Sequence, residues 1–225
     1  RGLLDAGDHA EVAALFGRHA RDPLAPPRPS PVRLPPVVPS GLVNPLTIAA
    51  FNEAWFRKSR PRQGHLRHLA GFFHPLDAVA NWNHVYGRRG FVQYQYVVAD
   101  EHRDLIGASI EHLQRAGAPV SLSVLKRFGP ADPGPLSFPA PGWTLALDLP
   151  VGPPGVPAAL RRLDEMVAAA GGRVYLAKDA RMDRDVFARM YPRLDEFEAI
   201  RAKLDPDGVL QSDLARRLGL CEEAR

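Results

Sequence analysis

The sequence predicts an α+β fold in which an antiparallel sheet is covered on one side by two helices. Two observations predict it. Between residues 91 and 176, segments that alternate polar and apolar side chains are separated by segments with apolar residues every three or four positions. Their order is strand, helix, strand, strand, helix, strand, and a βαββαβ unit of this kind carries both helices on one face of its sheet. A helical tail follows this unit.

Size and composition agree with such a fold. The 225 residues are 45% hydrophobic with a mean hydropathy of -0.20, which is typical of a globular chain with a substantial core. The net charge of +4 comes from scattered arginines without interleaved aromatic residues, so the sequence does not favour nucleic-acid binding. Cys221 is the one cysteine, and the fold therefore does not depend on an internal disulfide.

The segment before the βαββαβ unit is less regular. A short helix is expected within residues 1–20, and the dense prolines of residues 23–40 predict an extended connector, which is either a plain linker or a loop over a binding site. Residues 41–58 are expected to form a helix or a wide strand with an apolar side made of Phe51, Trp55 and Phe56.

A basic run at residues 57–67 and several histidines come next. The basic run is typical of a solvated loop, and it is also able to attract a phosphate. His65, His68 and His74 have no acidic residue or cysteine among them at the spacing of zinc ligands, so no metal site is expected.

The first strand is predicted at residues 91–98, with Gln93 and Gln95 on the face opposite Tyr94 and Tyr96. Asp100 is a suitable N-cap for the helix that follows, and the core-facing stripe of this helix consists of Ile106, Ile110 and Leu113.

Gly117 ends the first helix, and the second strand is predicted at residues 120–128. One face of that strand is formed by Leu122, Val124, Lys126 and Phe128. The third strand is predicted at residues 143–149, with one face formed by Thr144, Ala146 and Asp148.

Pro157 is typical of the first turn of the second helix, whose inward stripe is Leu160, Leu163 and Val167. Gly171 and Gly172 are expected to end it with a left-handed cap before a fourth strand at residues 173–177. In the tail, two more helices are expected after Asp183 and around residues 194–204, and Ser212 is expected to cap a last short helix.

Polar side chains gather on the sheet face that the two helices would leave uncovered. They are Gln93, Gln95, Lys126 and Thr144, with Lys178 just past the last strand. Amide, hydroxyl and ammonium groups suit a polyhydroxyl or phosphate-bearing ligand, or the carbonyl edge of a flavin. A solvated open sheet explains the same pattern, and periodicity leaves both interpretations open. No P-loop, G-x-G-x-x-G, G-x-S-x-G or H-E-x-x-H motif is present, so nothing supports a kinase or hydrolase.

Several motifs resemble the decaprenylphosphoryl-β-D-ribose oxidase family, and the resemblance runs from about Leu34 to Leu220. The motifs are FVQYQY at 91–96, LKRFGP at 125–130, PLSFP at 135–139, PGW at 141–143, YLAKD at 175–179 and YPR at 191–193 with Asp205-Pro206. These enzymes are FAD-dependent oxidases of the vanillyl-alcohol-oxidase class, related to the aldonolactone oxidases. With a short-chain reductase they form the 2′-epimerase of actinobacterial arabinan synthesis.

The resemblance implies that this chain, which begins at Arg1, is the C-terminal half of such an enzyme. Residues 1–172 would form the substrate cap domain, with flexible loops at 23–40 and 57–89. Residues 173–225 would return to an FAD-binding domain that is absent from the chain. The implied cofactor is FAD. The implied partners are a lipid-linked pentose phosphate substrate, a short-chain NAD-dependent reductase and a peripheral membrane contact, in the cytoplasm or at either face of the plasma membrane.

The resemblance also implies roles for particular residues. Tyr175 and Lys178 match flavin-contacting positions, and Lys178 is the expected catalytic residue because it would stabilise the charge that develops on the flavin during hydride transfer from the 2′ carbon. The positions that match the substrate pocket are Gln93, Gln95, Leu122, Val124, Lys126, Phe128, Thr144 and Ala146, together with His74, Leu76 and Trp82 on a mobile loop. The chain departs from the family pattern at Thr144, where relatives often carry Asn, at Ala146, where many carry Cys, and at Phe73, where Tyr is common. The resemblance therefore implies that no thiol lies in the pocket.

Two other interpretations remain open at the level of sequence. One is a D-arabinono-1,4-lactone type of aldonolactone oxidase, which shares the tail motifs and acts on small sugars. The other is a non-catalytic, ferredoxin-like βαββαβ binding module, because this fold hosts regulatory, binding and enzymatic functions alike.

Overall fold

The computed structural model describes residues 32–36, 38–39, 41–58 and 79–221, and the chain divides into two compact units at Gly90. In the first unit, helix α2 (Pro45–Lys58) begins at Asn44, whose side-chain Oδ1 accepts hydrogen bonds from the backbone N–H groups of Leu46 and Thr47. Residues 41–58 therefore favour the helix over the strand. The helix predicted within residues 1–20 lies outside the described residues.

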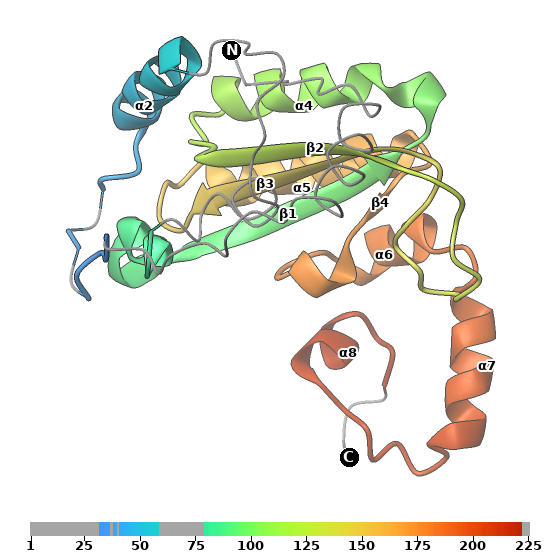
Figure 1. The fold of residues 1–225 in the computed structure, drawn as a ribbon. Coiled ribbons are helices and arrows are strands. Elements are labelled where there is room, and N and C mark those ends of the chain that lie inside the picture. Colours follow the sequence, from blue (N-terminus) through green and yellow to red (C-terminus); the bar gives the residue numbers. More distant parts are fainter. Residues whose placement is uncertain (1–31, 37, 40, 59–78, 222–225) are drawn as a thin grey trace, which may run out of the picture. The chain divides into compact units, whose positions relative to one another are not determined.

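The second unit contains the predicted sheet (Figure 1). Its strands are β1 (Phe91–Val98), β2 (Leu122–Phe128), β3 (Gly142–Pro150) and β4 (Arg173–Val174). The spatial order is β2-β3-β1-β4, and every neighbouring pair is antiparallel. Together with helices α4 (Asp104–Arg115) and α5 (Val156–Ala169), the strands confirm the α+β class and the βαββαβ order.

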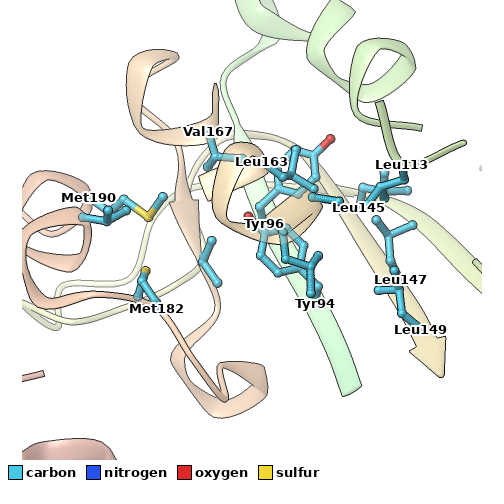
Figure 2. Packing of buried hydrophobic residues seen from close by; sticks show 14 of the residues in the cluster. Tyr94, Tyr96, Leu113, Leu145, Leu147, Leu149, Leu163, Val167, Met182 and Met190 are labelled. Atoms are coloured by element: carbon cyan, nitrogen blue, oxygen red, sulfur yellow. The ribbon is translucent and has the colours of Figure 1, made fainter. Parts of the chain in front are cut away.

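The core lies between the sheet and the two helices (Figure 2). The inward stripes predicted from the sequence are confirmed: Leu113 on α4 and Leu163 on α5 are fully buried against the leucines of β3. Two tyrosines of β1 carry hydroxyls into this core, and each hydroxyl has a partner. Tyr94 donates to Asp164 over 2.9 Å, and Tyr96 shares a hydrogen bond of 2.7 Å with Ser109.

The start of α4 differs from the prediction. A 3₁₀ turn, η3 (Asp100–His102), intervenes, and α4 begins at Asp104. The carboxylate of Asp100 is not a helix cap, because it accepts a hydrogen bond of 2.5 Å from Arg127 on β2. The sequence identifies Asp100 as a residue that is able to cap a helix. It does not show that Arg127, a distant residue, uses the same carboxylate.

The fourth strand is shorter than predicted. The ladder of β4 ends at Val174, although the backbone N–H of Tyr175 still donates to the carbonyl of Gln95 over 2.7 Å. The chain then turns through the 3₁₀ turn η4 (Leu176–Lys178), and the backbone N–H groups of Arg181 and Met182 donate to the carboxylate of Asp179. The Asp179 carboxylate thus satisfies the backbone N–H groups of the segment that follows the turn.

The tail contains three helices, α6 (Arg184–Met190), α7 (Leu194–Leu204) and α8 (Asp213–Arg217). The predicted cap is confirmed at Ser212, whose hydroxyl accepts a hydrogen bond from the backbone N–H of Ala215. Between α7 and α8 the carboxylate of Asp205 accepts from the N–H groups of Val209 and Leu210 and so closes the turn. Within the described ranges, no helix is long and apolar enough to cross a membrane.

Candidate functional site

The candidate site is the face of the sheet opposite α4 and α5, which we call the free face. Strand register arranges its side chains in three rows that run across β2, β3 and β1. The first row is Leu122, Asp148 and Gln93, the second is Val124, Ala146 and Gln95, and the third is Lys126, Thr144 and Val97. Directly paired residues of an antiparallel sheet point to the same side, so seven predicted pocket residues lie together with Asp148 and Val97.

Two hydrogen bonds join β1 to β3 on this face. The amide Nε2 of Gln95 donates to Oγ1 of Thr144 over 3.0 Å, and both side chains are buried. The amide Nε2 of Gln93 donates to Oδ1 of Asp148 over 3.0 Å. The Gln95 amide is therefore held in a defined orientation inside the protein, whereas the exposed Gln93 is oriented by its bond to the buried Asp148.

Asp148 and Lys178 are the electrostatic centre of the free face. Burial raises the pKa of Asp148, while the hydrogen bond from Gln93 and the positive charge of Lys178 act in the opposite direction. Burial lowers the pKa of Lys178, and the negative charge of Asp148 opposes that shift, whereas the positive charge of Lys126 adds to it. The Lys178 ammonium and the Asp148 carboxylate thus each favour the charged form of the other.

One oxygen of Asp148 has no hydrogen-bond partner within the part of the chain that the structure describes. The side chain is only 3% exposed, Oδ1 is held by Gln93, and Oδ2 is buried without a donor. Buried polar atoms are rarely left unpaired, so this oxygen marks a place where a donor is missing.

An aromatic cluster closes one end of the free face. Phe138 stacks on Tyr175 with ring centroids 4.6 Å apart and meets Phe128 edge-on at 5.6 Å. The chain reverses direction after Tyr175 and reaches Lys178 within one 3₁₀ turn, in which the Lys178 N–H donates to the Tyr175 carbonyl. The short turn therefore ties the position of Lys178 to that of the aromatic cluster.

Three predicted pocket residues are not placed on the free face. His74 and Leu76 lie outside the described residues. Trp82 belongs to the first unit, where it begins the 3₁₀ segment η2 (Trp82–Arg89) and packs edge-on against Tyr86. These three remain expectations from the resemblance.

Two residues of the site were missed as candidates, and each carried a signal in the sequence. Asp148 continues the alternation of Thr144 and Ala146, so its face was predictable, and a carboxylate inside a strand is uncommon. Phe138 lies in the turn-rich segment between β2 and β3, where no periodicity indicates its direction. In the described part of the chain no group of three or more His, Cys, Asp or Glu is placed to hold a metal ion.

Comparison with known proteins gives three similarities. A family model described as D-arabinono-1,4-lactone oxidase matches residues 156–218, which comprise α5, β4 and most of the tail. A protein named decaprenylphosphoryl-beta-D-ribose oxidase, from Mycolicibacterium smegmatis, is 41% identical over 220 residues, which is 98% of this chain and 48% of that protein. An uncharacterised protein of Streptomyces coelicolor, from the 5′ region of mprA, is 42% identical over 98% of this chain and 61% of its own length.

The chain thus spans about half the length of the mycobacterial protein that it matches. The similarity extends across all four strands of the sheet, since only 2% of the chain is left out of it. This confirms the resemblance that the motifs of the sequence indicated. The chain is therefore related to FAD-linked oxidases, through decaprenylphosphoryl-β-D-ribose oxidase over nearly its whole length and through the D-arabinono-1,4-lactone oxidase model over residues 156–218.

Proposed function

We propose that the native protein containing this chain is an FAD-dependent oxidoreductase that converts the 2′-hydroxyl of a polyprenylphosphoryl-β-D-ribose to a ketone in the synthesis of cell-wall arabinan precursors. The observation that carries the proposal is the 41% identity to a decaprenylphosphoryl-β-D-ribose oxidase along 98% of the chain, which includes every strand of the free face. Bound FAD would supply the acceptor for the hydride that leaves the sugar carbon.

The free face fits the reactive end of a flavin. An isoalloxazine ring presents carbonyl oxygens along one edge, and Lys178 offers an ammonium one 3₁₀ turn after Tyr175, at the end of the chain's passage along the sheet. The unpaired Oδ2 of Asp148 shows that the same surface still lacks a hydrogen-bond donor, which the hydroxyls of a sugar would provide. We therefore assign flavin contact to Tyr175 and Lys178.

The substrate would lie along the three rows of the free face. Gln93 and Gln95 are able to hydrogen-bond sugar hydroxyls, and Lys126 supplies a cation for the phosphate. Leu122, Val124, Ala146 and Phe128 offer apolar contact beside these polar groups. Residues 1–172 would act as the substrate cap, and residues 173–225 would return to the FAD-binding part of the native protein.

Lys178 would stabilise the negative charge that the flavin would gain when it accepts the hydride from the sugar. Preorganised charges of this kind act strongly because they do not have to reorient during the reaction. Replacing Lys178 with Ala in the native protein should slow anaerobic flavin reduction by a short-chain polyprenylphosphoryl ribose by about 100-fold. Stopped-flow absorbance measures this rate, and Lys203→Ala, on the exposed side of α7, is the matched control. An unchanged rate in the Lys178 variant would contradict the role.

A second enzyme function is favoured by the family match over residues 156–218, namely oxidation of an aldonolactone. The two functions differ in the compound that reduces the flavin, which is measured as a loss of its visible absorbance. Reduction by D-arabinono-1,4-lactone, together with no reduction by the ribosyl phosphate, would replace the first proposal with the second. A purified native protein that is colourless and binds no FAD would favour the ferredoxin-like binding module instead.

The product would be a keto sugar, and its subsequent reduction fits a short-chain NAD-dependent reductase as partner. The basic run at residues 57–67 would provide peripheral contact with an anionic membrane carrying the lipid-linked substrate, at either face of the plasma membrane. The described part of this run begins at Arg57, which pairs with Glu53 over 2.8 Å. Binding of the native protein to phosphatidylglycerol vesicles should weaken with added salt, and salt-independent binding would contradict this contact.

A further inference from the structure

We propose that Asp148 is a second catalytic residue, whose Oδ2 accepts a hydrogen bond from the sugar hydroxyl that is oxidised and then takes its proton. The inference rests on the proposed function and deepens it, since it names the group that removes the proton. Neither the motifs nor the comparisons assign a role to Asp148. Its carboxylate lies on β3, between β2 and β1.

The geometry leaves one oxygen of this carboxylate without a hydrogen-bond donor from the described residues. Asp148 lies in the first row between Leu122 and Gln93, and the Gln93 amide fixes Oδ1 at 3.0 Å. Oδ2 is buried, and no donor reaches it from the described residues. A buried oxygen without a partner destabilises the folded chain. A carboxylate that served only to link β1 to β3 would therefore not be expected to bury its second oxygen in this way.

The chemistry of the missing partner follows from that of the carboxylate. An ionised carboxylate only accepts hydrogen bonds, so the ligand must offer a donor at this point. A sugar hydroxyl does so, whereas a phosphate group would meet the carboxylate as a second negative charge. The first row of the free face is therefore the sugar end of the site.

The proposed step removes a proton and a hydride from the sugar. The O–H bond of the secondary alcohol breaks and its proton passes to Asp148 Oδ2, which becomes a neutral carboxylic acid. The C–H bond would break, and its hydride, with both electrons, would go to FAD, the oxidant of the proposed function. A C=O bond forms on the sugar. Burial makes Asp148 a stronger base than an ordinary aspartate, and the Gln93 amide and the nearby Lys178 ammonium favour its ionised form.

Asp148→Asn in the native protein is the direct test, because Asn keeps an oxygen for the Gln93 amide and removes only the basic group. Flavin reduction by short-chain polyprenylphosphoryl ribose should slow by about 100- to 10,000-fold, as expected for the loss of a general base. Asp132→Asn, which changes an exposed loop carboxylate, is the matched control and should leave the rate unchanged.

The pH dependence separates a base from a structural carboxylate. Among the described residues, the charged group that acts on Asp148 is Lys178 on η4, which favours the ionised carboxylate, and Lys126 on β2 acts in turn on Lys178. The wild-type kcat/KM should therefore fall at low pH as Asp148 becomes protonated, and this acid limb should be lost in Asp148→Asn. An Asp148→Ala variant should regain part of its rate in added formate, which supplies a carboxylate of small size.

A binding measurement provides a readout that does not depend on turnover. With the flavin already reduced, calorimetry compares the ribosyl ligand with its 2-deoxy analogue. The wild type should prefer the hydroxylated ligand by about tenfold or more, the range of a hydrogen bond to a charged group. Asp148→Ala should bind the two ligands equally, whereas Asp132→Asn should keep the preference.

The outcomes distinguish this inference from the proposed function. If the wild type fails to reduce its flavin with the ribosyl substrate, the proposed function fails. If the wild type is active but Asp148→Asn keeps its rate and its acid limb, the role of Asp148 alone is overturned. Equal hydroxyl preference in the wild type and Asp148→Ala would overturn it as well, even if an altered fold had slowed the Asn variant.

Discussion

Single residues on the free face are positioned mainly by side chains of the neighbouring strand. Thr144 is fully buried, and its hydroxyl is the partner of the equally buried Gln95 amide. The sequence placed Thr144 and Gln95 on the same uncovered face, but alternation alone did not distinguish a paired amide from a solvated one. The structure shows that Gln95 is held by the strand beside it.

Replacing Thr144 with Val should destabilise the protein, because the shape is kept while the buried Gln95 amide loses its acceptor. The expected loss is about 1–3 kcal/mol in the free energy of unfolding, the cost of a buried polar group left unpaired. Urea denaturation measures it. Thr144→Ser keeps the hydroxyl and removes only the methyl group, so it is the control. A loss in Thr144→Val no larger than that in Thr144→Ser would contradict the role of the hydroxyl.

Lys178 should control the alkaline side of the pH profile if its ammonium is required. Its pKa is lowered by burial, with Lys126 acting in the same direction and Asp148 opposing, so it loses its proton at a lower pH than an exposed lysine. The kcat/KM of the wild type should therefore fall as pH rises. In Lys178→Arg, whose guanidinium stays charged, this alkaline fall should be absent. An identical alkaline limb in the two proteins would show that another group titrates there.

At the scale of elements, the corner between α5 and β4 brings Tyr175 and Lys178 to the site. Gly171 adopts φ 62°, and the N–H of Gly172 donates to the carbonyl of Val167 over 2.9 Å, which closes the helix. The chain then enters β4 directly beside β1. The glycine pair predicted this cap from sequence, and the prediction is confirmed.

Gly172 should tolerate no side chain. A Cβ at this position would lie 2.5 Å from the Val97 carbonyl and 2.8 Å from Cγ1 of Val98, so β1 and β4 would have to separate. Gly172→Ala should lower the melting temperature, with a cost of about 1–3 kcal/mol for overpacking. Gly107→Ala, inside α4 with nothing within 4 Å of the new Cβ, is the contrasting control and should raise stability by about 0.5–1 kcal/mol. The same sign in both variants would contradict this explanation.

On the scale of the whole sheet unit, a buried network of charges joins the tail to the sheet. The Arg181 guanidinium bonds both oxygens of Asp164 on α5, at 2.7 and 2.9 Å, and Asp164 also accepts from Tyr94 on β1. Arg217 on α8 reaches Asp179 over 2.8 Å. These links hold the segment after β4 against the sheet.

Arg181→Met should be strongly destabilising at neutral pH, because it leaves the buried carboxylate of Asp164 without its cation. The expected loss is about 3–5 kcal/mol, which is typical of breaking a buried ion pair. Burial already raises the pKa of Asp164, and Asp179 adds to this while Arg181 and Tyr94 oppose it, so removal of Arg181 raises the pKa further.

The pH dependence of this loss has a definite sign. Above the raised folded-state pKa, the ionised carboxylate weakens the variant, and as pH falls through that value the folded protein takes up a proton before the unfolded chain does. The destabilisation should therefore shrink toward acid pH in urea titrations. Arg189→Met, which breaks the exposed pair with Glu165, should cost less than about 1 kcal/mol, and an equal loss in both variants would contradict the role of burial.

The sequence was sufficient for the parts of this protein that depend on neighbouring residues. Alternation located β1, β2 and β3, three- and four-residue spacing located the inward faces of α4 and α5, and Ser212 and the glycine pair marked helix ends. Quoted motifs also indicated the family to which the chain is related. These features are readable because strand and helix periods appear directly in the order of side chains.

Contacts between residues that are far apart in the sequence were decided only by the tertiary structure. The register of three strands placed Asp148 beside Gln93, which lies 55 positions away, and left Oδ2 without a partner. The Asp100 carboxylate accepts its hydrogen bond from Arg127 on β2, and β4 ends at Val174, where the chain turns into η4. Local sequence cannot determine these outcomes, since each depends on which donor or acceptor long-range packing brings nearest.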